Sequence, residues 1–366
     1  MKKSLSGLSI ILSLALQAQH DSLSGTSPIS GTDGFKFSAY ADLYYAYDFA
    51  QPANHLRPSF LYTYNRHNEV NLNLGYIMAT YKNAFVRGNL ALMSGTYAQY
   101  NLASESSVFQ HVLEAMVGLK VSKKHNLWVD AGIMPSHIGF EGYIGKNCWT
   151  LSRGILAENS PYYESGIKLG YTSQNNKLFI AALYLNGWQH IQRPDGNQTP
   201  AFGTQVSLTP NAKTKLNWST FVGNEFPDSS RKWRYFNNFY GQFQLGKRVG
   251  LIAGFDIGLQ QTFTGSISYH VWYTPNLILR YLLSDNLHIA LRGEYYADPD
   301  QVIINTGKAS GFKTYGYSLN LDYQIRENIL WRIEARGFQS MDNIFIDGNS
   351  STNSNFCLTT ALLFSF

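Results

Sequence analysis

The chain has 366 residues and a formal net charge of +5; 15% of its residues are aromatic and only 14% are charged. An average soluble domain carries about 25% charged residues, and a net charge this small does not indicate a nucleic-acid partner. The two cysteines, Cys148 and Cys357, provide neither a disulfide framework nor a Cys-based metal site.

The N-terminal segment 1–19 has the pattern of a secretory signal peptide. Two lysines follow Met1, an apolar stretch runs from Leu8 to Leu16, and cleavage is expected near Gln19. The apolar stretch is far shorter than the roughly 18–20 residues of a membrane-spanning helix. Residues 20–34, rich in Ser, Gly and Thr, are predicted to form a flexible leader.

After the leader, apolar and polar residues alternate in one segment after another. A period of two predicts β-strands with one apolar face, and most segments match the roughly nine to eleven residues of a tilted membrane-crossing strand, or slightly exceed them. We count sixteen segments: 35–49, 69–81, 84–97, 111–121, 126–136, 161–173, 177–188, 201–209, 214–224, 235–245, 249–262, 268–282, 286–297, 312–324, 328–339 and 354–366. Because residues 178–183 are apolar on both parities, the count is uncertain by two.

The connections between these segments alternate between short and long. Turn-like links such as Lys82-Asn83 and Ser284-Asp285 are separated by seven longer stretches: 50–68, 98–110, 137–160, 189–200, 225–234, 298–311 and 340–353. Short periplasmic turns and long outer loops are typical of bacterial outer-membrane β-barrels, which have an even number of strands. The prediction is therefore an all-β, antiparallel transmembrane barrel of about 16 strands.

The last predicted strand has the features of a closing strand. Apolar residues or Thr occupy every second position from Phe356 to Phe366, the final residue. In an outer-membrane barrel this strand pairs with the first and presents one face to lipid. The predicted organisation is a signal peptide (1–19), a flexible periplasmic leader (20–34) and an outer-membrane barrel (35–366), with lipid as a partner.

The parity of each strand assigns its charged residues to the lumen, because a charge facing the bilayer midplane costs about 2–4 kcal/mol. Four lumen-parity arginines concentrate late in the chain and predict a basic wall along the pore: Arg280, Arg292, Arg332 and Arg336. Acidic neighbours, Glu294, Glu334 and Asp322, are expected to neutralise part of this wall. A barrel of this width with a polar lining predicts an aqueous channel.

The third long stretch, 137–160, is longer than a connector needs and contains many apolar residues. We expect it to fold into the lumen and narrow the pore. Its constriction charges are Glu141, Lys146, Arg153 and Glu158. A disulfide between Cys148 and Cys357 is left open, since it requires the loop to reach that wall with Cα atoms within about 7 Å.

Several stretches resemble one known family. They are SAYADLYYAYDF (38–49), NEVNLNLGYIMATYKNAFVRGNLALMSGTY (68–97), the segment from LWVDAGIMPSHIGF to ESGIKLGY (127–171) and LYLNGWQHI (183–191). The chain is similar here to the beta-barrel porin-2 (OmpL-like) family of Bacteroidetes outer-membrane proteins. The resemblance implies an outer-membrane barrel that acts as a channel, and it assigns no functional residues.

The sequence contains no recognised catalytic motif. His137 and Glu141 are four residues apart, but Pro135 and nearby glycines predict a loop rather than a metal-binding helix. We therefore predict no enzyme, no cofactor and no metal, but a passive porin for small hydrophilic solutes or ions in the bacterial outer membrane, with a homo-oligomer left open. The alternatives are a substrate-specific channel, an outer-membrane barrel hydrolase, and a secreted soluble β domain that binds carbohydrate.

Overall fold

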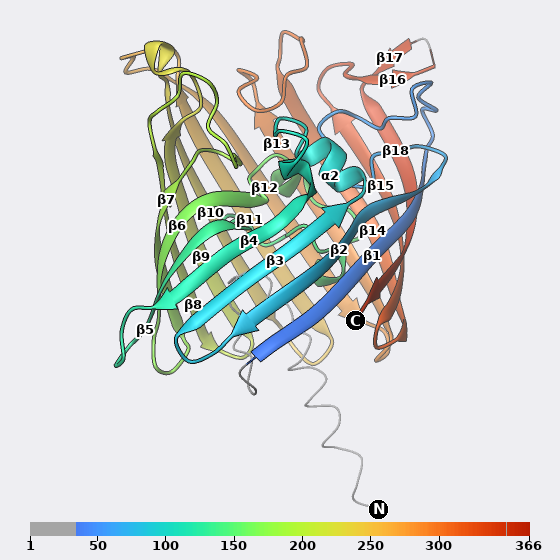
Figure 1. Cartoon of the computed structure of the whole chain (residues 1–366). Helices are drawn as coiled ribbons and strands as arrows, with labels where there is room; N and C mark the ends of the chain where they lie inside the picture. Colours follow the sequence, from blue (N-terminus) through green and yellow to red (C-terminus); the bar gives the residue numbers. More distant parts are fainter. Residues whose placement is uncertain (1–33, 349) are drawn as a thin grey trace, which may run out of the picture.

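In the computed structural model, which describes residues 34–348 and 350–366, sixteen antiparallel strands close into one barrel (Figure 1). The barrel strands are β1 (Gly34–Asp48), β2 (Val70–Lys82), β3 (Val86–Ser94), β4 (Val112–Lys120), β5 (Asn126–Pro135), β6 (Tyr163–Thr172), β7 (Leu178–Leu185), β8 (Ala201–Asn211), β9 (Thr214–Asn224), β10 (Trp233–Gln244), β11 (Val249–Gln261), β12 (Tyr269–Leu282), β13 (Leu287–Asp298), β14 (Phe312–Arg326), β15 (Ile329–Ser340) and β18 (Ser354–Ser365). The predicted strand count and order are confirmed. The predicted signal peptide lies outside the described residues, as does the predicted leader up to residue 33; Gly34 already belongs to β1.

Closure of the barrel depends on the first and last strands. β1 pairs antiparallel with β18 from Tyr40↔Ser365 to Asp48↔Cys357. Beyond this register, Ala39 and Phe366 exchange two backbone hydrogen bonds of 2.8 and 3.1 Å. The pairing predicted from the terminal alternation is therefore confirmed.

The two ends of the barrel differ in the length of their connections. Seven short turns lie at one end, which we call the turn end, together with the start of β1 and the end of β18 (Figure 1). The opposite end, the loop end, carries eight connections. Seven were predicted as long loops; the eighth, Thr262–Ser268, was missed because it is almost as short as a turn. No helix within the described ranges is long and apolar enough to cross a membrane.

Two local elements differ from the prediction. The third predicted strand, 84–97, ends at Ser94, and helix α2 (Thr96–Asn101) follows. Gly95 makes this break possible: its φ of 123° is left-handed, and a Cβ there would lie 2.5 Å from the Asn73 carbonyl oxygen. In the last connection, β16 (Phe345–Asp347) and β17 (Ser350–Thr352) form a small hairpin that alternation over such short segments does not reveal.

The outer and inner faces of the strands follow the predicted parity. On β12, for example, Leu277 and Leu279 are exposed outward, whereas Trp272 and Asn276 are buried inside. At the end of β18, Phe364 and Phe366 are both exposed on the outer surface. An apolar belt surrounds the barrel, and the polar side chains of its strands face inward, as a bilayer requires.

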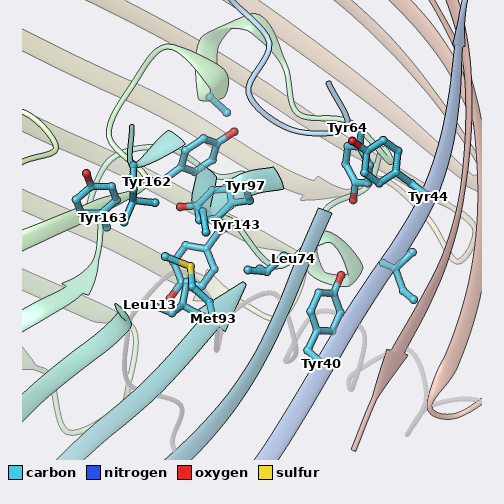
Figure 2. Close-up of a cluster of buried hydrophobic side chains, with 14 of the residues drawn as sticks. Tyr40, Tyr44, Tyr64, Leu74, Met93, Tyr97, Leu113, Tyr143, Tyr162 and Tyr163 are labelled. Atoms are coloured by element: carbon cyan, nitrogen blue, oxygen red, sulfur yellow. The ribbon is translucent and has the colours of Figure 1, made fainter. Parts of the chain in front are cut away.

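Much of the lumen is filled by side chains and inward-folded connections. On the wall made by β1 to β4, a cluster rich in tyrosines links the strands to α2 and to two loops (Figure 2). The ring centroid of Tyr97 lies 6.1 Å from that of Tyr143 and 5.8 Å from that of Tyr162, and Tyr44 meets Tyr64 at 5.2 Å. Two of these pairs are edge-to-face and the Tyr97–Tyr143 pair is tilted, and such aromatic contacts stabilise the inward position of the loops.

Candidate functional site in the barrel lumen

The connection between β5 and β6, residues 136–162, lies inside the barrel, and we call it the inner loop. Every residue from Cys148 to Pro161 is buried. It contains the single turns η2 (Gly145–Asn147) and α3 (Ile155–Glu158). The prediction that this connection folds into the lumen is confirmed.

The inner loop first runs along the wall formed by β9 to β11. The Gly139 N–H donates to Asn238 Oδ1 at 3.1 Å, and the Phe140 ring lies 5.7 Å from that of Tyr240. A Cβ on Gly254 of β11 would come within 2.5 Å of the Phe140 ring, so a glycine is needed there for the loop to lie this close. The Leu151 N–H then donates to Asn320 Oδ1 on β14 at 2.9 Å. The loop therefore contacts well-separated strands of the wall.

Three of the four predicted wall arginines bind the backbone of the inner loop. Arg292 donates to the Ser152 carbonyl at 2.7 Å, and Arg336 donates to the Arg153 carbonyl at 2.7 Å. Arg332 donates to the carbonyls of Gly145 and Cys148 at 2.8 and 3.0 Å. Hydrogen bonds from a charged donor contribute about 1.5–3 kcal/mol each, so these contacts fix the loop in place.

The same arginines are paired with the predicted acidic neighbours. Arg292 lies 3.0 Å from Glu334, Arg336 lies 2.7 Å from Glu294, and Arg332 lies 2.6 Å from Asp322. All three arginines are at most 3% exposed. Arg280, the fourth, is only partly buried, and its guanidinium stacks 4.7 Å from the ring centroid of Trp149.

The charges of the inner loop have different partners. Glu141 accepts a hydrogen bond from the Gly154 N–H at 2.8 Å, and Glu158 accepts one from the Tyr62 N–H at 2.9 Å. Burial raises the pKa of both carboxyl groups above the ordinary value. Arg153 binds carbonyls of its own loop, those of Gly142, Tyr143 and Leu151. Lys146 is exposed and donates to Ser365 Oγ at 2.8 Å.

His137 has a role that the sequence did not reveal. Its Nδ1 lies 2.6 Å from Glu164 Oε1 on β6, and its Nε2 lies 2.8 Å from the Thr220 carbonyl on β9. Burial lowers the pKa of His137, but the Glu164 carboxylate and the Thr220 carbonyl outweigh it, and the pKa ends above its ordinary value. The ring therefore links two walls at the start of the inner loop. Sequence spacing does not reveal this partner, because Glu164 lies on β6, 27 positions after His137.

The two cysteines are free thiols. Cys148 meets the wall at Arg332, which is in register with Ala361, whereas Cys357 is in register with Arg336. Four residues of strand separate these positions, about 13 Å at 3.3 Å per residue. The inner loop thus reaches the wall that carries Cys357, but Cys148 is too far from Cys357 along the strand direction for a disulfide.

The connection between β1 and β2, residues 49–69, also enters the barrel, which sequence reasoning missed. We call it the first loop. Its Tyr64 hydroxyl donates to Asp42 Oδ2 at 2.5 Å on β1, and its Tyr62 N–H binds Glu158 of the inner loop. The signal in the sequence was the density of Tyr and Asn in residues 60–65, side chains that fill space and still make polar contacts.

Part of the inner wall keeps polar atoms without a protein partner. Buried, unpaired side-chain atoms occur on β10 to β12 at Tyr240, Gln242, Asp256, Thr274 and Asn276. Nearly all buried polar atoms in proteins are hydrogen-bonded to protein or water. These side chains therefore mark one region of the lumen that can bind water or a polar solute.

Comparison with known proteins gives one family and many similar folds. The family model described as "Putative beta-barrel porin-2, OmpL-like" matches residues 34–366. No curated protein sequence is significantly similar.

Among solved structures, an anion-selective porin from Comamonas acidovorans is 9% identical, with a TM-score of 0.60 over 92% of this chain and 100% of that one. OmpF of Salmonella typhi, in a complex with daunomycin, is 11% identical, with a TM-score of 0.58 over 91% and 98% of the two chains. OmpT of Vibrio cholerae in its trimer form is 8% identical, with a TM-score of 0.57 over 92% and 100%. At these identities the likeness concerns the fold.

Proposed function

Because the chain belongs to the beta-barrel porin-2, OmpL-like family and is an outer-membrane porin, we propose that it is a narrow, passive channel for small hydrophilic solutes or ions. The observation that carries the proposal is the inner loop, which crosses the lumen and is held there by Arg292, Arg332 and Arg336. A sixteen-stranded barrel without such a loop encloses a wide aqueous channel. An anchored loop reduces the cross-section of this channel.

The charges around the inner loop support weak ion selectivity. Arg292, Arg332 and Arg336 each have an acidic partner, so this wall presents little net charge to a passing ion. The unpaired polar atoms of β10 to β12 favour uncharged hydrophilic solutes and water over one sign of ion. One solved neighbour is an anion-selective porin, and we propose that this chain discriminates less.

We propose further that the barrel has no enzymatic activity. A hydrolase at the rim needs a nucleophile bonded to a histidine. His137 is paired with Glu164, and His270 lies 3.1 Å from Asp300. In residues 34–348 and 350–366, no serine hydroxyl is hydrogen-bonded to either ring.

We also propose that the barrel forms a homo-oligomer, since one similar barrel forms a trimer. Chemical cross-linking in native membranes tests it: ladder bands support the oligomer, and only monomer contradicts it.

The experiment that tests the channel is conductance in a planar bilayer, combined with liposome swelling by sugars of increasing size. The wild-type protein is compared with a variant lacking residues 142–156 and with a control lacking 228–231, an exposed segment at the loop end. We expect stepwise conductance in all three, and a larger step and size limit in the first deletion only.

Absence of steps from the folded wild-type protein would contradict the channel itself. An unchanged step after removal of 142–156 would contradict the constriction. Heat-dependent mobility in gels establishes that each variant has folded.

A further inference from the structure

A cavity of about 630 Å³ lies at the loop end, and we call it the outer pocket. It is enclosed by the first loop, by residues 304–306 of the connection between β13 and β14, and by the β16–β17 hairpin. In Figure 1 the blue first loop lies beside the red β16 and β17 at this end of the barrel. The volume falls within the roughly 300–1,000 Å³ of small-molecule sites.

Two charged residues, Arg57 and Asp48, line the outer pocket, and Arg57 is its cationic group. Its side chain is 1% exposed, and its Nη1 donates to the Tyr64 carbonyl at 3.2 Å. Its Nε and Nη2 have no hydrogen-bond partner. These two atoms form the edge of a guanidinium that binds a carboxylate through two parallel hydrogen bonds. A buried guanidinium edge without a partner is costly, so this edge is suited to an anionic ligand.

The nearest acid does not satisfy that edge. Asp48 Oδ2 lies 3.8 Å from Arg57 Nε, beyond hydrogen-bond distance. Asp48 Oδ1 already accepts from the Asn355 side-chain amide at 2.8 Å and from the Ala50 N–H at 3.0 Å. The hydrogen bonds to Oδ1 thus hold Asp48 with its Oδ2 at 3.8 Å from Arg57 Nε, and both donors of the arginine edge remain free for a second carboxylate.

The other residues that line the outer pocket indicate the chemistry of the remainder of the ligand. Apolar side chains form much of the wall: Phe60, Leu61, Ile304, Phe345 and Ile346. Two amide oxygens, Asn65 Oδ1 and Asn355 Oδ1, are buried without a donor. They can accept hydrogen bonds from a hydroxyl or N–H group of a ligand.

We propose that the outer pocket binds an organic carboxylate with an apolar body and a hydrogen-bond donor, held by the free edge of Arg57. The class includes aromatic hydroxy acids and short apolar peptides with a free C-terminus. Binding in the outer pocket does not require the proposed channel function. Only the passage of the bound solute through the barrel rests on it, because the pocket would concentrate this solute at the outer mouth of the channel.

Calorimetric titration of the full-length barrel in detergent with phenyllactate tests the pocket. The alcohol counterpart, in which CH₂OH replaces the carboxylate, and inorganic phosphate are the comparison ligands. We expect binding of phenyllactate, with the alcohol and phosphate weaker by about tenfold or more. Arg57→Gln should weaken phenyllactate binding by about tenfold or more, whereas Arg231→Gln, at an exposed loop arginine, should leave it unchanged.

A second variant distinguishes loss of the binding site from misfolding of Arg57→Gln. Ile346 lines the pocket but is 66% exposed, so Ile346→Glu places a repelling charge at the mouth without disturbing the core. It too should weaken phenyllactate binding. No binding, equal binding of the alcohol, or unchanged binding in both variants would overturn the proposal.

Two further results keep this inference separate from the channel. Phosphate binding as tightly as phenyllactate would replace the organic carboxylate with an inorganic anion and overturn the proposed ligand class. Conductance in KCl is measured on the same preparation. Conductance without phenyllactate binding overturns the pocket alone, and binding without conductance overturns the channel alone.

Discussion

Arg292 on β13 and Glu334 on β15 meet at 3.0 Å across the intervening strand β14, and Ser152 of the inner loop binds both of them. The Ser152 N–H donates to Glu334 Oε2 at 2.8 Å, while Arg292 Nη2 lies 3.1 Å from the Ser152 hydroxyl oxygen. The same two residues thus stabilise both the wall and the inner loop. Any change in the pair should therefore be detected in both stability and conductance.

The first prediction concerns Glu334→Gln. Removing this charge leaves Arg292 with only the longer contacts to Glu294 at 3.5 Å and Glu141 at 3.9 Å. Breaking a buried ion pair costs up to about 3–5 kcal/mol. We expect a lower urea midpoint for the barrel and a noisier, larger conductance as the inner loop detaches. Glu327→Gln, at an exposed turn, is the control and should change the free energy of unfolding by less than about 0.5 kcal/mol. Equal effects of the two substitutions would contradict the anchoring role.

The second prediction concerns the combined replacement of Arg292, Arg332 and Arg336 by Gln. It removes three positive charges from the lumen, so the reversal potential in a salt gradient should shift towards cations. The control removes three positive charges from exposed positions at the turn end: Lys247, Arg248 and Arg326. If the lumen variant conducts with an unchanged reversal potential, the arginines are structural and the ions pass elsewhere.

The third prediction is a pH dependence that arises from His137. Its pKa in the folded protein lies above the ordinary value of 6.5, so the folded state binds this proton more tightly than the unfolded state. The resulting stabilisation is complete below the unfolded pKa and is lost as the pH rises through the folded pKa. Wild-type barrel should lose free energy of unfolding, relative to His137→Gln, as the pH rises above the ordinary histidine pKa of 6.5.

The matched control is His270→Gln, which removes a histidine from the exposed pair with Asp300. This variant should keep the wild-type pH dependence. A constant difference in unfolding free energy between wild type and His137→Gln across this rise in pH would exclude the ion pair with Glu164.

Sequence alone predicts the barrel because alternation is a local property that each strand carries by itself. The position of the inner loop is also predictable, since its length and apolar residues require a place to be buried. Strand parity also places the wall arginines and their acidic neighbours on one wall, but it does not predict which of them contact each other or the loop backbone. Glu334 follows Arg292 by 42 positions, and the two meet only after three strands have taken their register.

The outer pocket cannot be predicted from the sequence for the same reason. Arg57, in a loop near the start of the chain, shares the cavity with Asn355 near the end. Closure of β1 on β18 brings these distant segments together, and the path of a loop depends on contacts that its own sequence does not encode.

The last prediction concerns the terminal residue. The backbone of Phe366 exchanges two hydrogen bonds with Ala39, and its ring is 72% exposed on the outer face beside Phe364, at a centroid distance of 5.3 Å. Deleting Phe366 removes both bonds, worth about 0.5–1.5 kcal/mol each, together with lipid-facing apolar area. We expect a smaller heat-modifiable fraction in gels of outer membranes. Phe366→Leu keeps the backbone bonds and an apolar side chain, and should assemble nearly as well as the wild type. Normal assembly of the deletion variant would show that closure does not depend on this final pair.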